Sequence, residues 1–131
     1  MIRRLGGLAA CCLVTGALLP TAAAGAAPGA IDCDYTLSAP YVVDVAGTPM
    51  VTATLSPAAC PSTIVTVLQA CVSTPGKVGR CDNTSGNTSA QVYLAPYVPG
   101  LAYTARGRGC SAVAVPPTSI CSSLGPTTAV L

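Results

Sequence analysis

Few residues of this chain could do chemistry, and the types that most enzymes depend on are missing. The sequence has no histidine and no glutamate, so neither a Ser-His-Asp triad nor a Cys-His pair can be assembled. Asp32 and Asp34 could form a carboxylate pair for glycoside hydrolysis, but that chemistry needs an acid in a pocket and these two lie near the N-terminus of the domain. They could also touch calcium, but too few other acids are present to complete its shell. A Ser-Lys pair would have to use Lys77, the only lysine, where burial is not expected. The composition predicts a protein that is not an enzyme and has no cofactor.

The first residues have the pattern of a secretory signal peptide. Arg3 and Arg4 precede an apolar run, Leu5–Leu19, and small residues follow at Ala24 and Ala26. The run is shorter than the roughly 20 residues that a spanning helix needs. We therefore expect residues 1–26 to be removed and residues 27–131 to form one secreted domain that does not span a membrane.

A second interpretation of the same segment is a lipid anchor. Leu8-Ala9-Ala10-Cys11 matches a bacterial lipobox, in which the cysteine is lipidated. Only six residues separate Arg4 from Cys11, and the apolar run continues past the cysteine, so a cleaved signal explains the pattern better. Attachment through Cys11 is the minor alternative.

Six cysteines follow the signal segment, and their number and spacing predict disulfides. They are Cys33, Cys60, Cys71, Cys81, Cys110 and Cys121. An even number in a small exported domain is typical of a disulfide framework. Zinc would need closely spaced ligand pairs, whereas the nearest cysteines are ten residues apart and no histidine is available. We expect three disulfides and no metal site.

Strands must hold these cysteines, because no stretch after the signal segment has useful helical periodicity. Six segments are rich in Val, Ile, Thr or Tyr and are bounded by turn-forming residues. They are Tyr41–Val45, Met50–Leu55, Thr63–Val72, Ala90–Ala95, Leu101–Arg108 and Thr127–Leu131. This pattern predicts an all-β, disulfide-stapled, immunoglobulin-like antiparallel β-sandwich of about six or seven strands.

Strand order limits the disulfide pairing to one scheme. If no strand forms between Ser73 and Ser89, the last four cysteines share one end of the sandwich and could exchange partners. If a short strand forms near Lys77–Cys81, Cys81 faces Cys71 in a hairpin. Only one scheme satisfies both layouts, namely Cys33–Cys60, Cys71–Cys81 and Cys110–Cys121.

The segment from Tyr97 to Ala105 resembles the tyrosine corner of fibronectin type III and related immunoglobulin-like sandwiches. Tyr97, Pro99 and Tyr103 match the positions of that motif. The resemblance implies that the Tyr103 hydroxyl bonds back to the backbone across the corner. Ala105 stands where immunoglobulin domains have a cysteine, and tryptophan is absent, so the domain is not a strict immunoglobulin. The whole mature sequence is also similar in style to small Ala/Thr/Pro-rich secreted proteins of actinomycetes.

The same tyrosine sets the phase of its strand, because successive side chains point to opposite faces. If Tyr103 points inward, the inward set also contains Ala105, Gly107 and Gly109. The outward set is then Arg106, Arg108 and Cys110.

Four cations are the candidate binding residues, and they fall in two places. Arg106 and Arg108 would lie on one face of a strand, about 7 Å apart, where they could contact a carboxylate or another anion. They could equally be a solvated face that keeps the sheet from aggregating. Lys77 and Arg80 lie in the Cys71–Cys81 loop, which a trypsin-like protease could recognise as bait, or which is an ordinary stapled turn.

Charge and composition also limit the partners. After the signal segment, four aspartates balance the four cations, so there is no basic patch for nucleic acid and no polybasic run for membranes. Asn83 and Asn87 begin glycosylation sequons, which matter only in a eukaryotic secretory route. The sequence favours a secreted, non-catalytic module that binds a protein or cell-envelope component through surface loops. The alternative is a secreted protease inhibitor that uses the Cys71–Cys81 loop.

Overall fold

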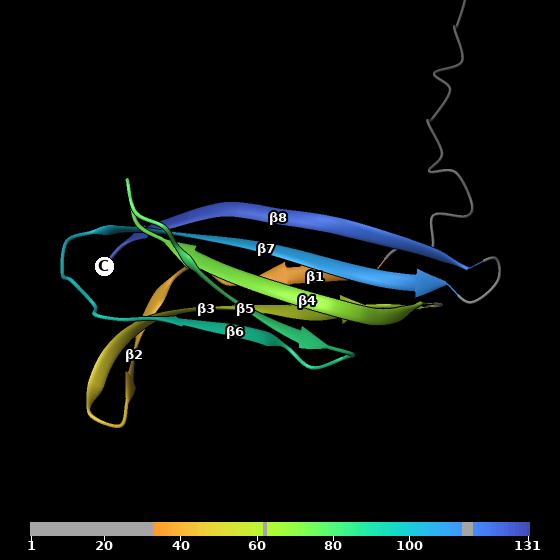
Figure 1. Cartoon of the computed structure of the whole chain (residues 1–131), viewed down its shortest axis with the longest axis horizontal. Helices are drawn as coiled ribbons and strands as arrows, with labels where there is room; N and C mark the ends of the chain where they lie inside the picture. The colour runs from red at the N-terminus through yellow and green to blue at the C-terminus, as the bar shows by residue number, and fades with distance from the viewer. Residues whose placement is uncertain (1–32, 62, 114–116) are drawn as a thin grey trace, which may run out of the picture.

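Two antiparallel sheets face each other in the computed structural model, which describes residues 33–61, 63–113 and 117–131 (Figure 1). Sheet A contains β1 (Asp34–Leu37), β2 (Tyr41–Val45), β3 (Thr48–Ala59) and β6 (Ala90–Leu94). Sheet B contains β5 (Arg80–Ser85), β4 (Ile64–Ser73), β7 (Ala102–Val113) and β8 (Thr118–Val130), in that spatial order. The predicted all-β, disulfide-stapled sandwich is confirmed.

The described residues form eight strands, where about six or seven were expected. The two strands that the sequence pattern did not indicate are β1 and β5. β5 is rich in polar residues, and it forms because its whole length from Arg80 to Ser85 pairs with β4. One of the two strand layouts predicted a short strand near Lys77–Cys81 that forms a hairpin with the strand before it. β5 begins close to that position and forms this hairpin with β4.

Three strands pair with β3, which is the centre of sheet A. β1 pairs with the C-terminal part of β3, and β2 pairs with its N-terminal part. β6 pairs with Val51–Leu55, overlapping the β3 residues used by both other strands, so β6 must lie on the opposite edge. β1 and β2 therefore run end to end along one edge of β3. Figure 1 shows the β2–β3 hairpin bending away from the rest of the sandwich.

The described ranges contain no helix, and so none long and apolar enough to cross a membrane. The expected signal peptide at residues 1–26, its boundary with residue 27, and the lipidation site at Cys11 all lie outside the described residues.

Apolar side chains from both sheets fill the space between them. Alternation along β3 directs Val51, Ala53 and Leu55 inward, where they meet Leu68 and Val72 of β4. The remaining buried hydrophobic residues are Cys33, Val65, Ala70, Ala90, Val92, Tyr103 and Ala105. Tyr103 is the largest fully buried side chain, in a chain without phenylalanine or tryptophan.

The predicted phase of β7 is confirmed. Its burial alternates from Tyr103 through Ala105, Gly107 and Gly109, while the arginines between them are exposed. The two glycines are needed because sheet A lies very close at this point. A Cβ atom on Gly109 would lie 2.6 Å from ring carbons of Tyr35, and one on Gly107 would lie 2.8 Å from a methyl carbon of Leu55.

All three predicted disulfides are present, and each joins neighbouring strands of the same sheet. Cys33–Cys60 closes the end of the β1–β3 pair, with Cα atoms 4.3 Å apart. Cys71–Cys81 links directly opposed residues of β4 and β5, and Cys110–Cys121 links opposed residues of β7 and β8, each with Cα atoms 4.0 Å apart. Immunoglobulin domains instead carry a disulfide that bridges their two sheets.

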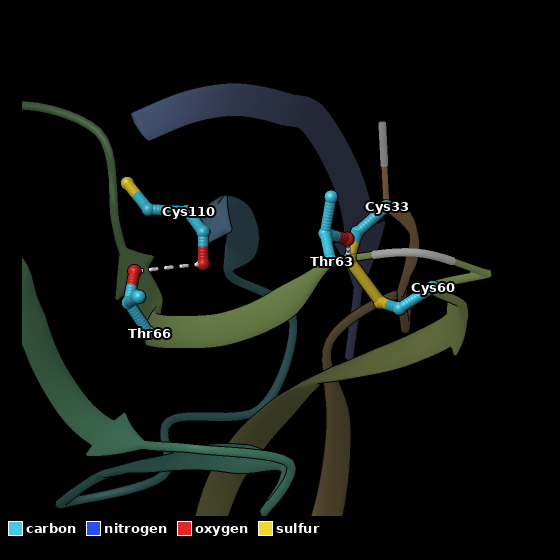
Figure 2. Close-up of a disulfide and its surroundings, with 5 residues drawn as sticks. All are labelled: Cys33, Cys60, Thr63, Thr66 and Cys110. Atoms are coloured by element: carbon cyan, nitrogen blue, oxygen red, sulfur yellow. Dashed lines mark hydrogen bonds between the residues drawn. A yellow bond between two sulfur atoms is a disulfide. The ribbon is translucent and has the colours of Figure 1, made fainter. Parts of the chain in front are cut away.

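Threonine hydroxyls support the cysteines at the end of the sandwich where β4 begins. In Figure 2 the Thr63 hydroxyl lies 2.8 Å from Sγ of Cys33, to which it donates. Thr66 is the extra residue of a β-bulge between Val65 and Val67, and its hydroxyl donates to the Cys110 carbonyl at 3.1 Å (Figure 2). The bulge and the Thr66 hydrogen bond therefore mark the register of β4 against β7.

Candidate functional site

The four candidate cations lie on separate surfaces and do not form one patch. Arg106 and Arg108 project from the outer face of sheet B, whereas Lys77 lies in the loop between β4 and β5. Arg80 pairs with Val72, which is buried between the sheets, so Arg80 leaves β5 on the side opposite to Arg106. None of the four cations forms an ion pair with a carboxylate in the described part of the chain.

A row of polar side chains crosses the outer face of sheet B. Gln69 of β4 pairs with Asn83 of β5 on one side and with Arg108 of β7 on the other, and Arg108 pairs with Ser123 of β8. Directly opposed residues in a sheet project from the same face. We call this set, Asn83, Gln69, Arg108 and Ser123, the polar row.

Disulfides lie on both sides of the polar row. On one side the neighbouring positions are Cys81, Cys71 and Arg106, in register across β5, β4 and β7. On the other side they include Cys110 and Cys121. One disulfide therefore constrains the backbone on each side of the polar row, which limits the movement of the strands that carry its side chains.

Two shallow hollows flank Arg108. One is about 230 Å³ and is bordered by Gln69, Asn83 and Cys110, among others. The second is about 300 Å³ and is bordered by Arg106, Arg108 and Ser123. A guanidinium presents up to five N–H donors in a planar fork that matches carboxylate and similar oxyanions. The face offers two such forks, and amide and hydroxyl groups lie in register with that of Arg108.

The stapled loop between β4 and β5 forms a second candidate surface. Figure 1 shows this loop rising beyond the end of the sandwich. Pro75 and Gly76, with φ of 70° at the glycine, form a turn closed by a 3.2 Å hydrogen bond from the Lys77 nitrogen to the Thr74 carbonyl. Lys77 is exposed just after this turn, and Val78 is 99% exposed.

A cavity of about 240 Å³ lies between this loop and the connection from β6 to β7. Its walls are mainly apolar, with Lys77 at one side. The lining residues are Thr74, Lys77, Val78, Leu94, Ala95, Pro96, Val98, Leu101 and Tyr103. We call this cavity, together with the exposed apolar residues Val78, Val98, Leu101 and Val130 around it, the loop end.

Hydrogen bonds make the loop end a fixed structure. The Val98 nitrogen donates to the Tyr103 hydroxyl at 2.9 Å, and that hydroxyl donates to the Val98 carbonyl at 3.3 Å. The last residue, Leu131, donates its N–H to the Leu101 carbonyl at 3.1 Å. This contact places Val130, which is 72% exposed, beside the same connection.

The two sequon asparagines lie in different settings. Asn83 belongs to the polar row on the outer face of sheet B, and Asn87 lies in the exposed loop between β5 and β6.

The sequence alone indicates the two arginines but not the residues around them. Gln69 stands alone as a long polar side chain in the apolar run of β4, and that contrast was an available signal. Asn83 and Ser123 gave no such signal, because their places depend on the pairing of β5 and β8. Comparisons with family models, curated proteins and solved structures found no match.

Proposed function

We propose that this chain is an exported, non-catalytic binding module that holds a protein partner at its loop end. Export is supported by the signal-like first 26 residues together with three disulfides, which form and persist in oxidising compartments. The absence of histidine and glutamate supports a role without catalysis. The hydrogen bond between Tyr103 and Val98 supports the likeness to fibronectin type III domains.

The observation that carries the binding role is the apolar surface of the loop end. Val78 is almost fully exposed beside a mainly apolar cavity, and Val98, Leu101 and Val130 are exposed nearby. Exposed apolar residues that gather around a cavity are typical of protein interaction sites. The Cys71–Cys81 bond and the tyrosine hydrogen bond hold the site in shape, so little conformational entropy is lost on binding.

Capture from an envelope and secretome extract by the immobilised, disulfide-intact domain tests this function. Val78→Asp should abolish capture of a defined partner, because it puts a charge into the apolar contact. Ile64→Asp is the matched control, since Ile64 is 70% exposed at the opposite end of β4. Equal capture by both variants would overturn the proposal. A turnover activity lost in Asp82→Asn would overturn the non-catalytic role.

Protease inhibition is the second candidate, and one observation favours it. The Cys71–Cys81 loop protrudes and presents an exposed Lys77 followed by an exposed Val78. Wild-type protein should then inhibit a trypsin-like protease at micromolar concentration, and Lys77→Ala should remove the inhibition. Arg80→Ala serves as the control, because Arg80 lies within strand β5 instead of at the tip. No inhibition by the wild type would eliminate this candidate.

A further inference from the structure

The arginines of β7 are not placed to protect a sheet edge. Charged residues commonly prevent aggregation when they lie on an edge strand. β7 is an interior strand of sheet B, between β4 and β8. The edge strand β8, by contrast, carries no charged side chain along Thr118–Val130. Arg106 and Arg108 therefore need another explanation.

Both guanidiniums lie on a face without acidic neighbours. Asp82 pairs with Ala70, which is buried between the sheets, so its side chain leaves β5 away from the outer face. Asp34 and Asp44 belong to strands of sheet A. Among the residues that the structure describes, the outer face of sheet B thus has two positive charges and no negative one. This charge distribution is complementary to an anionic ligand.

Spacing and side-chain chemistry narrow the class of anion. Arg106 and Arg108 are about 7 Å apart along β7, and the polar row spans about 14 Å from β5 to β8. The site is therefore extended, and it can meet more than one group of a polymer. Gln69, Asn83 and Ser123 both donate and accept hydrogen bonds, as the hydroxyl groups of sugars do. Among the residues that border the two hollows, the only large aliphatic ones are Val67 and Leu124. The face therefore lacks the large central apolar anchor that is typical of protein interfaces.

We propose that the outer face of sheet B binds an anionic polysaccharide. Its carboxylate or sulfate groups pair with Arg106 and Arg108, and its hydroxyl groups bond to Gln69, Asn83 and Ser123. The Cys71–Cys81 bond holds β5 against β4, and the Cys110–Cys121 bond holds β8 against β7, before the polymer binds. This site is separate from the loop end, and it does not depend on the protein partner proposed there.

Calorimetric titration of the disulfide-intact domain tests the proposal with four polymers. Polygalacturonate carries carboxylates, dextran sulfate carries sulfates, dextran is neutral, and poly-glutamate is an acidic peptide. The domain should bind one or both anionic polysaccharides and should not bind dextran. Affinity should fall as salt is raised, because exposed charges are screened. Tighter binding of polygalacturonate would identify carboxylate as the preferred group, and tighter binding of dextran sulfate would identify sulfate.

Substitutions connect the binding to the named residues. Arg108→Gln should weaken binding by about tenfold or more, since it removes a charge-assisted contact. Arg108→Lys keeps the charge but loses the planar fork, so we expect an intermediate loss. Arg80→Gln is the matched control, with the same charge change on the opposite side of β5, and should bind like the wild type. Each variant should keep the wild-type unfolding midpoint, which shows that it is folded.

Three outcomes would overturn this inference. The first is that the wild type binds neither anionic polysaccharide, or binds dextran equally well. The second is that Arg80→Gln loses as much affinity as Arg108→Gln, because binding would then reflect net charge alone. The third is tighter binding of poly-glutamate than of both polysaccharides, which would assign the face to an acidic peptide. A loss of binding in Val78→Asp, by contrast, concerns the loop end only.

Discussion

The Tyr103 hydroxyl accepts a 2.9 Å hydrogen bond from the Val98 nitrogen and donates one of 3.3 Å to the carbonyl of the same residue. Tyr103 is buried on β7, whereas Val98 lies in the connection that precedes this strand. One side chain therefore fills the core and also fixes the connection that lines the apolar cavity. The Tyr97 ring lies 6.4 Å from the Tyr103 ring, centroid to centroid, and packs on the same corner.

Tyr103→Phe should destabilise the domain while leaving the core packing nearly unchanged. The substitution removes only the hydroxyl, so the part-buried Val98 N–H and carbonyl lose their partner. An unsatisfied polar group of this kind costs about 1–3 kcal/mol. Urea unfolding measures the loss. Tyr97→Phe is the control, because no hydrogen bond of its hydroxyl is found among the described residues, and it should change stability by less than about 0.5 kcal/mol. Equal stabilities of the two variants would contradict the structural role of the bond.

Gly109→Ala should destabilise the sandwich by overpacking. The added Cβ would lie 2.6 Å from ring carbons of Tyr35, so one of the two sheets must shift. Inserting a carbon into a packed core costs about 1–3 kcal/mol. Combining it with Tyr35→Leu should reduce the added cost, because the ring that causes the clash is gone. A double-mutant cycle measures this coupling, and strict additivity of the two changes would show that the sheets are not in contact there.

Removing the disulfides one pair at a time should give a ranked loss of stability. In the chain-entropy model, a loop of 27 residues contributes about 3.6 kcal/mol and loops of 10 or 11 about 2.7 kcal/mol. Cys33→Ala with Cys60→Ala should therefore lower the unfolding free energy most. Denaturant unfolding of the three double variants tests the order. Peptide mapping without reduction tests the pairing itself, and a Cys71–Cys110 link would contradict the structure.

The parts of the fold that were predictable have strong local signals. β2 begins and ends where its Val and Tyr content indicated, at Tyr41 and Val45. The inward phase of β7 followed from a single assumption about Tyr103, because alternation in a strand determines the remaining positions. The disulfide scheme followed from strand order, without any cysteine motif.

The parts that were missed depend on long-range pairing. β3 continues past Ser56 and Pro57 to Ala59. Its pairing with β6 ends at Leu55 and Ala90, so beyond that point β3 pairs only with β1. A proline is tolerated in a strand that lacks one neighbour. The local sequence predicts that the strand ends before such a proline. Its continuation depends on pairing with β1, which the local sequence does not indicate.

β8 was missed over most of its length for a related reason. Gly125 and Pro126 read as a turn, yet they form an irregularity opposite Arg106, with φ of 86° at the glycine. The edge position makes this possible, since β8 has a described neighbour on one side only. Without β8, the sequence could not place Ser123 beside Arg108, so it indicated Arg108 but not the other residues of the polar row.

Ala46→Asn should stabilise the domain by relieving the turn of the β2–β3 hairpin. Ala46 and Gly47 have φ of 53° and 82°, the left-handed pair that a two-residue hairpin turn requires. A residue with a Cβ pays roughly 1–2 kcal/mol in this conformation, and asparagine tolerates it better than alanine. We therefore expect the free energy of unfolding to rise by about 0.5–1 kcal/mol, measured as a higher urea midpoint at unchanged slope. Gly47→Ala is the matched change at the next position, where a Cβ meets nothing within 4 Å, so its effect reports the backbone conformation alone. It should destabilise by about 1 kcal/mol. A lower midpoint for Ala46→Asn, or no effect of Gly47→Ala, would show that the hairpin does not hold this turn in solution.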